Sequence, residues 1–301
     1  MPEFISKLQH KTYEKGEFSD ETVRTLDETV DVIKTFPWDN ERTLTDIQLT
    51  GPSVTIQDEY VNYLKIGLYF NGKFCLYYLD CDNNLYEYHV AEMADVINVV
   101  TDFFDRQISL DKFDKHFLSA GSKKHFENAS FDYAINSFNF FTRLFLFFIL
   151  FAVLACCGFV IVFDDSPLFA KLFFVPFTLF FELFIVYSTF LTVKFYARSK
   201  NMYLNIASGN NQFQFGDNNG DIKNYKKSEI SVINVYGPLS GKSKPILTIM
   251  EINFLDGSKI ELPGLLIDPF VFRSKFANTT VVLFNKPSDL RKKRWSFANG
   301  N

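Results

Sequence analysis

The middle of the chain carries two long runs of apolar residues that are separated by a short acidic turn. Residues 144–163 contain no charged side chain, and residues 172–196 are apolar apart from a few positions such as Pro176, Glu182 and Lys194. A helix of about 20 residues is about 30 Å long, which matches the hydrocarbon thickness of a bilayer. The pattern therefore predicts a transmembrane hairpin, with helices over residues 144–163 and 172–196.

Basic residues flank this apolar region on its outer sides. They accumulate before the first run and after the second, while the turn between the runs is followed by Lys171 alone; the flanking residues are Lys123, Lys124, Arg143, Lys194, Arg198 and Lys200. Lysine and arginine are enriched on the cytoplasmic side of membrane proteins. We therefore expect a multi-pass protein of the cell (inner) membrane with both termini in the cytoplasm.

Glu182 is the acidic residue inside the second apolar run. An ionised carboxylate that faces lipid costs several kcal/mol, so we expect this side chain to face protein. Two interpretations follow. Glu182 is either the proton- or ion-linked group of a small transporter or channel, or a protonated residue that hydrogen-bonds Thr178, Ser188 or a neighbouring subunit. A homo-oligomer is compatible with both.

The segment before the hairpin has the pattern of a small α+β domain over residues 1–118, with a linker over residues 119–143. Helical periodicity covers residues 19–33, with Ser19 or Asp20 as N-cap, and residues 91–104. Strand patterns cover residues 63–70, 73–79 and 85–89. Asn71-Gly72 predicts a two-residue turn between the first two strands, which would place Leu68 opposite Cys75.

In that register, one face of the predicted hairpin is rich in aromatic side chains: Tyr63, Tyr69, Phe74 and Tyr78. An exposed aromatic face is typical of a protein-binding surface. The alternative is that residues 38–56 cover this face, and the sequence leaves both interpretations open.

After the hairpin, short strand patterns alternate with turn signals. The strands are expected over residues 203–206, 212–215, 230–236, 246–254 and 258–262. Asp268-Pro269 then predicts a helix start, with Asp268 as N-cap, and the helix is expected to run toward Phe284. We thus expect a mainly-β domain over residues 197–285 and a tail over residues 286–301.

Charge is distributed unevenly over these parts. The net charge is −10 over residues 1–143 and +7 over residues 197–301. Basic residues near an anionic bilayer surface are attracted to it. The candidates for such contacts lie in one loop and in the tail: Lys242, Lys244, Arg291, Lys292, Lys293, Arg294 and Trp295. Nucleic acid is not an expected partner, because the cations are not interleaved with aromatic residues along one element.

The sequence offers no pattern that would specify catalysis or a cofactor. The segment Gly237 to Ser243 resembles a phosphate-binding loop, but three residues lie between its glycines where the motif needs four. The four histidines are spread along the chain without an accompanying Cys or carboxylate at ligand spacing: His10, His89, His116 and His125. We expect neither an enzyme nor a metal or cofactor site.

The strand from Asp256 to Leu262 has the pattern dG-x-x-[IV]-x-[IL], and it lies between an apolar hairpin and a C-terminal helix. Over residues 144–284 this order of elements resembles bacterial two-pass membrane proteins with a pleckstrin-homology-like (PH-like) domain of the YcxB type. The resemblance implies a PH-like fold for the C-terminal domain, and it implies a binding module without catalytic residues.

We therefore expect a membrane-anchored binding or scaffold protein, whose cytoplasmic domains bind a protein partner and the anionic membrane surface. One alternative is an immunity protein, in which the acidic domain neutralises a basic toxin or effector. A second alternative is a small oligomeric transporter or channel that uses Glu182.

Overall fold

The computed structural model describes residues 2–43, 47–117, 120–163, 167–218, 220–237, 247–277 and 279–299. The chain divides into two compact units. The first contains Met1–Phe131 and Ala207–Asn210, and the second contains Asp132–Ile206 and Asn211–Asn301. Each unit has its own hydrophobic core and is described separately below.

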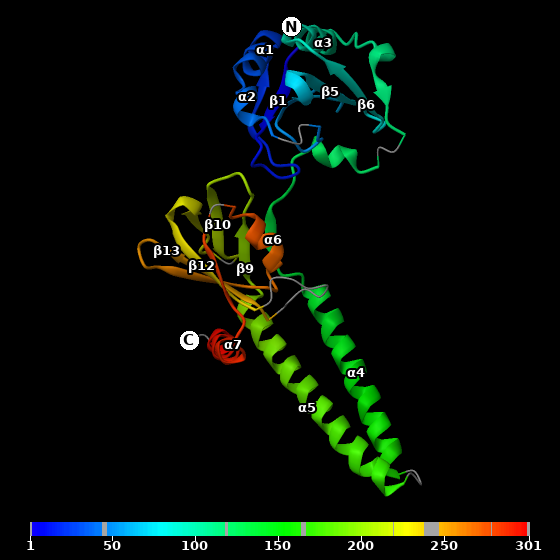
Figure 1. Ribbon diagram of the computed structural model, residues 1–301, viewed down its shortest axis with the longest axis vertical. Coiled ribbons are helices and arrows are strands. Elements are labelled where there is room, and N and C mark those ends of the chain that lie inside the picture. The colour runs from blue at the N-terminus through cyan, green and yellow to red at the C-terminus, as the bar shows by residue number, and fades with distance from the viewer. Residues whose placement is uncertain are drawn as a thin grey trace. The chain divides into compact units, whose positions relative to one another are not determined.

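The first unit is built on one antiparallel sheet with the strand order β2-β1-β3-β4-β5-β6-β7. Its strands are β1 (Phe4–Gln9), β2 (Ser19–Arg24), β3 (Ser53–Gln57), β4 (Tyr63–Leu68), β5 (Phe74–Leu79), β6 (Leu85–Val90) and β7 (Asp114–Lys115). Its helices are α1 (Leu26–Thr35), α2 (Trp38–Glu41) and α3 (Met93–Phe104). Figure 1 shows α1 and α3 side by side, and both contribute apolar residues to the core on one face of the sheet.

The first helix begins later than its sequence pattern predicts. Residues 19–24 form strand β2, and α1 starts after Thr25. The Thr25 side chain accepts a hydrogen bond from the Glu28 N–H, and the Glu28 carboxylate accepts one from the Thr25 N–H. This capping box satisfies free N–H groups of the first turn, so the helix start is fixed at Thr25, and the predicted cap at Ser19 or Asp20 is wrong.

The predicted register of the β4–β5 hairpin is wrong by one residue. Leu68 pairs with Phe74, and the loop contains Phe70, Asn71 and Gly72. Asn71 and Gly72 have positive φ angles of 56° and 81°, as the Asn-Gly signal requires, but the turn has three residues instead of two. A shift of one residue moves a side chain to the other face of a sheet.

The second face of the same sheet carries buried polar side chains, and a short segment of chain around Phe126 packs over them. Phe126, just after the 3₁₀ helix Ser122–His125, packs onto this face. Lys65 is fully buried there, and its Nζ lies 2.7 Å from the Gln9 Oε1 and 3.0 Å from the His125 carbonyl oxygen. Burial, with a smaller effect of the Lys7 charge, lowers the pKa of Lys65 to about 7.

The second unit contains two four-stranded sheets, in the orders β11-β10-β9-β8 and β14-β13-β12-β15. The strands are β8 (Asp132–Ala134), β9 (Met202–Asn205), β10 (Gln212–Asp217), β11 (Lys223–Lys226), β12 (Ile230–Tyr236), β13 (Ile249–Phe254), β14 (Lys259–Pro263) and β15 (Val281–Phe284). Both sheets and helix α6 (Pro269–Ser274) contribute to one core, with residues such as Phe213, Ile252 and Phe272.

Two long helices are inserted between neighbouring strands of the first of these sheets. α4 (Ser137–Phe163) follows β8, and α5 (Leu168–Ser199) leads into β9; β8 and β9 pair in an antiparallel register. In Figure 1, α4 and α5 run side by side away from the strands. The predicted linker over residues 119–143 therefore contains β8, which belongs to the C-terminal domain. This domain has one strand before the hairpin, and its other strands follow the hairpin.

The C-terminal part differs from its predicted form in two places. The helix that starts after Asp268 ends at Ser274, and residues 281–284 form β15, which pairs in parallel with β12. The basic segment that was expected to be a tail is helix α7 (Pro287–Asn299). Asp268 acts as the N-cap, as predicted, because its side chain accepts a hydrogen bond from the Phe270 N–H.

Candidate functional site

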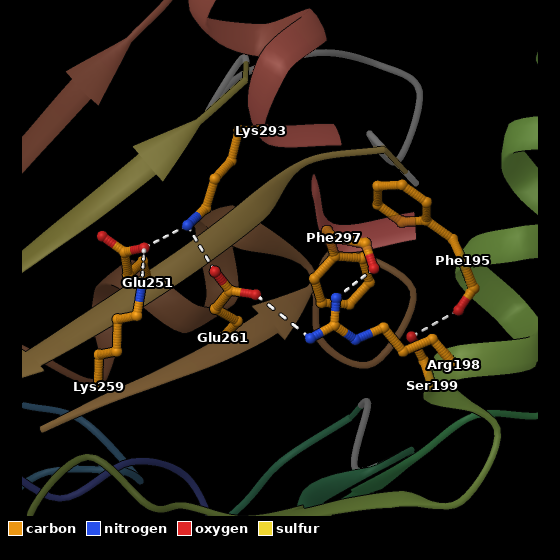
Figure 2. Close-up of polar contacts among 8 residues, drawn as sticks. All are labelled: Phe195, Arg198, Ser199, Glu251, Lys259, Glu261, Lys293 and Phe297. Atoms are coloured by element: carbon orange, nitrogen blue, oxygen red, sulfur yellow. Dashed lines mark hydrogen bonds and ion pairs between the residues drawn. The ribbon is translucent and has the colours of Figure 1, made fainter. Parts of the chain in front are cut away.

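The end of α5, the second sheet and α7 meet in a packed junction, which Figure 2 shows in close-up. Phe195 of α5 and Phe297 of α7 are fully buried, and their ring centroids lie 4.8 Å apart. The Arg198 guanidinium lies over the Phe297 ring, 4.3 Å from its centroid, and donates a hydrogen bond to the Phe297 carbonyl oxygen. These contacts attach α7 to the last turns of α5.

A charged network continues from this junction across the sheet (Figure 2). Lys293 of α7 forms ion pairs with Glu251 of β13 and, at 2.5 Å, with Glu261 of β14. Glu261 also lies 3.6 Å from the Arg198 guanidinium, so one carboxylate connects α5 and α7. The Lys259 ammonium lies 3.9 Å from Glu251, on the exposed side of the network.

The ionised forms of this network are favoured by their mutual contacts. Burial acts to lower the pKa of Lys293, but hydrogen bonds to Glu251 and Glu261 outweigh it and raise this pKa above its usual value. Burial likewise acts to raise the pKa of Glu251, while the contacts with Lys293 and Asn234 outweigh it and lower this pKa. Lys293 and Glu251 therefore stay charged at neutral pH, and their ion pair connects α7 to the sheet.

The seven residues predicted to contact the membrane surface do not share one environment. Lys293 is used in the ion pairs just described, and the Arg294 Nε donates a hydrogen bond to the Leu247 carbonyl oxygen. Arg291 and Lys292 are exposed on the other face of α7, and 53% of Trp295 is exposed. The remaining two, Lys242 and Lys244, lie outside the described residues.

Helices α4 and α5 are long and apolar enough to cross a membrane, over Phe140–Phe163 and Lys171–Ser199. Buried residues make up 0% of the most apolar stretch of α4 and 11% of that of α5, whereas a core helix of a soluble protein would be mostly buried. The helices contact closely at Gly158, where an added Cβ would lie 3.3 Å from the Thr178 hydroxyl. Small residues at such crossings are typical of membrane helix pairs.

Glu182 is partly buried on α5. The Thr178 hydroxyl, which was a predicted partner, donates instead to the Val175 carbonyl oxygen at 3.0 Å. Within the parts of the chain that the structure describes, no hydrogen bond or ion pair of Glu182 is found. Its role therefore stays a prediction.

An apolar groove of about 490 Å³ lies between α4 and α5. It is lined by Leu144, Phe147, Phe148, Phe151, Ile185, Val186, Thr189 and Phe190. A groove with this lining suits hydrocarbon, and it offers no set of charged groups that would bind a polar solute.

The four aromatic residues predicted to share one face of the β4–β5 hairpin do not do so. Because the register differs by one residue, Tyr63 and Tyr69 lie on one face, and Phe74 and Tyr78 lie on the other. Tyr63 and Phe74 are buried, and the Trp38 ring packs edge-on against Phe74 with centroids 5.2 Å apart. The predicted protein-binding face is therefore not formed, and Trp38 covers Phe74, one of its four predicted members.

The structure also corrects the expectation that the histidines stand apart from other candidate ligands. His89 and His116 each contact the carboxylate of Glu87, and Cys75 lies beside Glu87 and His89. The sequence does contain a signal for this cluster. The short turn at residues 80–84 joins β5 and β6 as an antiparallel pair, in which Cys75 lies directly opposite His89. Sequence reasoning missed this cluster because it considered only spacing along the chain.

Residues 132–275 match a family model described as a PH domain. This range begins at β8, includes both apolar helices and ends just after α6. The C-terminal domain is therefore PH-like, as the sequence resemblance implies. No curated protein and no solved structure matches the chain in the corresponding searches.

Proposed function

We propose that the protein is a membrane-anchored binding or scaffold protein with a PH-like domain at the cytoplasmic surface of the cell membrane. The observation that carries this proposal is the insertion of α4 and α5 between the paired strands β8 and β9. An apolar hairpin at this place would hold the PH-like sheet directly at the bilayer. PH domains bind lipids or proteins, and we propose a binding role without catalysis for this chain.

The lengths of the helices support this arrangement. At 1.5 Å per residue, the 32 residues of α5 extend over about 48 Å, whereas the hydrocarbon layer is about 30 Å thick. The end of α5 would therefore project from the hydrocarbon. Phe195 and Arg198, the residues that contact α7, lie in this last part, so α7 would lie near the headgroups.

The two faces of α7 support a contact with an anionic surface. Lys293 and Phe297 face the domain, while Arg291, Lys292 and Trp295 are exposed. An exposed face with two cations and one tryptophan suits the interface of an anionic bilayer, where each cation contributes about 1 kcal/mol of attraction. For the first unit, whose sequence is acidic, we propose a protein partner.

Tryptophan fluorescence tests the lipid contact in the full chain, because it contains only two tryptophans. Trp38 is buried in the first unit, so a Trp38→Phe variant reports on Trp295 alone. In nanodiscs that contain phosphatidylglycerol, we expect the Trp295 emission at shorter wavelength than in phosphatidylcholine nanodiscs. The double substitution Arg291→Glu with Lys292→Glu removes two favourable charges and should abolish the difference.

Lys226→Glu is the matched control. Lys226 pairs with Gln212 at the end of β10 that is remote from the β9–α5 connection, and its ion pair with Glu229 is exposed. This variant should keep the full shift. If the Trp38→Phe protein, with Arg291 and Lys292 intact, had the same emission wavelength in both lipids, the proposed contact would be contradicted. The immunity and transporter hypotheses are not favoured by an observation in the described residues and stay predictions.

A further inference from the structure

The second face of the sheet in the first unit brings together sulfur, nitrogen and oxygen donors. Cys75 on β5 pairs directly with His89 on β6, and Glu87 precedes His89 by two residues, so all three side chains lie on one face. Their ligand atoms all lie within 4.8 Å of one another. Figure 1 shows the two strands side by side.

A second histidine reaches the same carboxylate from the neighbouring strand. One oxygen of Glu87 lies 2.6 Å from the His89 Nε2, and the other lies 2.7 Å from the His116 Nε2. The His116 N–H donates to the Leu85 carbonyl oxygen at 2.9 Å, which fixes the backbone of His116 beside β6. The Glu87 carboxylate therefore lies between two imidazole rings, and each of its oxygens contacts one of them.

The members of the cluster differ in their exposure to solvent. Cys75 is fully buried, whereas 39% of the His89 side chain and 38% of the His116 side chain are exposed. The Tyr69 ring lies against the His89 ring with centroids 4.0 Å apart, which restricts the orientation of the imidazole. The histidines are therefore the members of the cluster that solvent reaches, and the sulfur of Cys75 lies beneath them.

We propose that Cys75, Glu87 and His89 bind one Zn²⁺ ion, and that His116 positions Glu87 through its second carboxylate oxygen. A thiolate, an imidazole and a carboxylate are the three ligand types that zinc takes from proteins. Three protein ligands leave the fourth tetrahedral position to water. On binding, the Cys75 thiol releases its proton to solvent and the sulfur forms the bond to zinc.

The place of the cluster in the fold indicates what the ion would do. Cys75 belongs to β5, Glu87 and His89 belong to β6, and His116 directly follows the two-residue edge strand β7. An ion bound to these residues would connect β5 to β6 and would hold the segment after β7 against the sheet through Glu87. Zinc would therefore stabilise this edge of the first unit.

Metal titration of the full chain in mild detergent, after removal of metals with a chelator, tests this proposal. One equivalent of Zn²⁺ should bind, and Co²⁺ in its place should give a sulfur-to-cobalt charge-transfer absorption. His89→Ala and Glu87→Gln change partly exposed ligands, so they should fold and lose more than about 100-fold in affinity. His116→Ala should lose about 10–100-fold, as is typical when a residue that orients a ligand is removed.

Two variants separate a thiolate ligand from other effects. Cys75→Ser should abolish the charge-transfer band, and because Cys75 is fully buried, its folding is to be checked by circular dichroism. Cys81→Ser, at an exposed cysteine two residues after the end of β5 and outside the cluster, should bind zinc and cobalt normally. Failure to bind one equivalent, or unchanged affinity in both His89→Ala and Glu87→Gln, would overturn the proposal.

Discussion

Phe297→Ala is expected to lower the free energy of unfolding of the second unit by about 4 kcal/mol, the usual cost of removing a buried phenylalanine ring. Phe297 is fully buried between Phe195 and the Arg198 guanidinium, so truncation leaves a cavity between α5 and α7 and removes a cation–π contact. Urea titration of the Trp38→Phe protein, followed by Trp295 fluorescence in detergent, measures this loss.

Phe270→Ala is the control for this substitution. Phe270 belongs to α6 in the same unit, but 66% of it is exposed, so the same change of side chain should cost less than about 1 kcal/mol. An equal, small effect of both substitutions would mean that α7 is not docked on α5, and it would contradict the junction.

Lys293→Met is expected to cost about 3 kcal/mol, because it leaves Glu251 and Glu261 near each other without their shared cation. Both carboxylates have side chains that are largely buried, with exposed fractions of 9% and 14%. Breaking a buried pair by removing one partner is strongly destabilising, since the remaining charge loses its compensation. The same urea titration reports this change.

Lys292→Met provides the matched comparison, since Lys292 is the adjacent residue of α7 and is exposed. Its unfolding free energy should stay within about 0.5 kcal/mol of the parent protein. Lys293→Met should also lose most of its penalty when Glu251→Gln and Glu261→Gln are added, because the two neighbouring carboxylate charges, which keep only the longer contacts with Lys259 and Arg198, are then removed. A full penalty in the triple variant would show that the ion pairs are not its cause.

The parts of the fold that local patterns determine could be predicted from the sequence. The apolar runs of α4 and α5, the strand patterns of β4 and β5 on either side of Asn71-Gly72, and the amphipathic stripe of α3 each lie within one segment of chain. Asp268-Pro269 predicted a helix start correctly because a cap acts on the N–H groups directly after it.

The parts that depend on distant pairing could not be predicted in this way. β8 has three residues, and its pairing with β9 spans the whole helical hairpin, so no local signal marks it. The Asn-Gly signal gave the right place of a turn but not its length, and one residue decided which face Tyr63 and Phe74 occupy. α7 looked like a tail because its apolar contact depends on Phe195, about 100 residues earlier.

The candidate sites show the same division. Charge alone grouped the four consecutive cations at residues 291–294, but the helical conformation of α7 turns Lys293 and Arg294 toward the domain. The Cys75, Glu87 and His89 cluster depends on the pairing of β5 with β6, and the sequence analysis predicted no register for these two strands.

Cysteine labelling in spheroplasts tests the membrane hairpin most directly. A Leu168→Cys variant, with Cys156 and Cys157 replaced by alanine, places a thiol at the exposed start of α5 and retains the exposed Cys81 in the first unit. A membrane-impermeant maleimide should label residue 168 in intact spheroplasts and Cys81 only after lysis. Labelling of both residues before lysis, or of both only after it, would contradict a hairpin that crosses the bilayer.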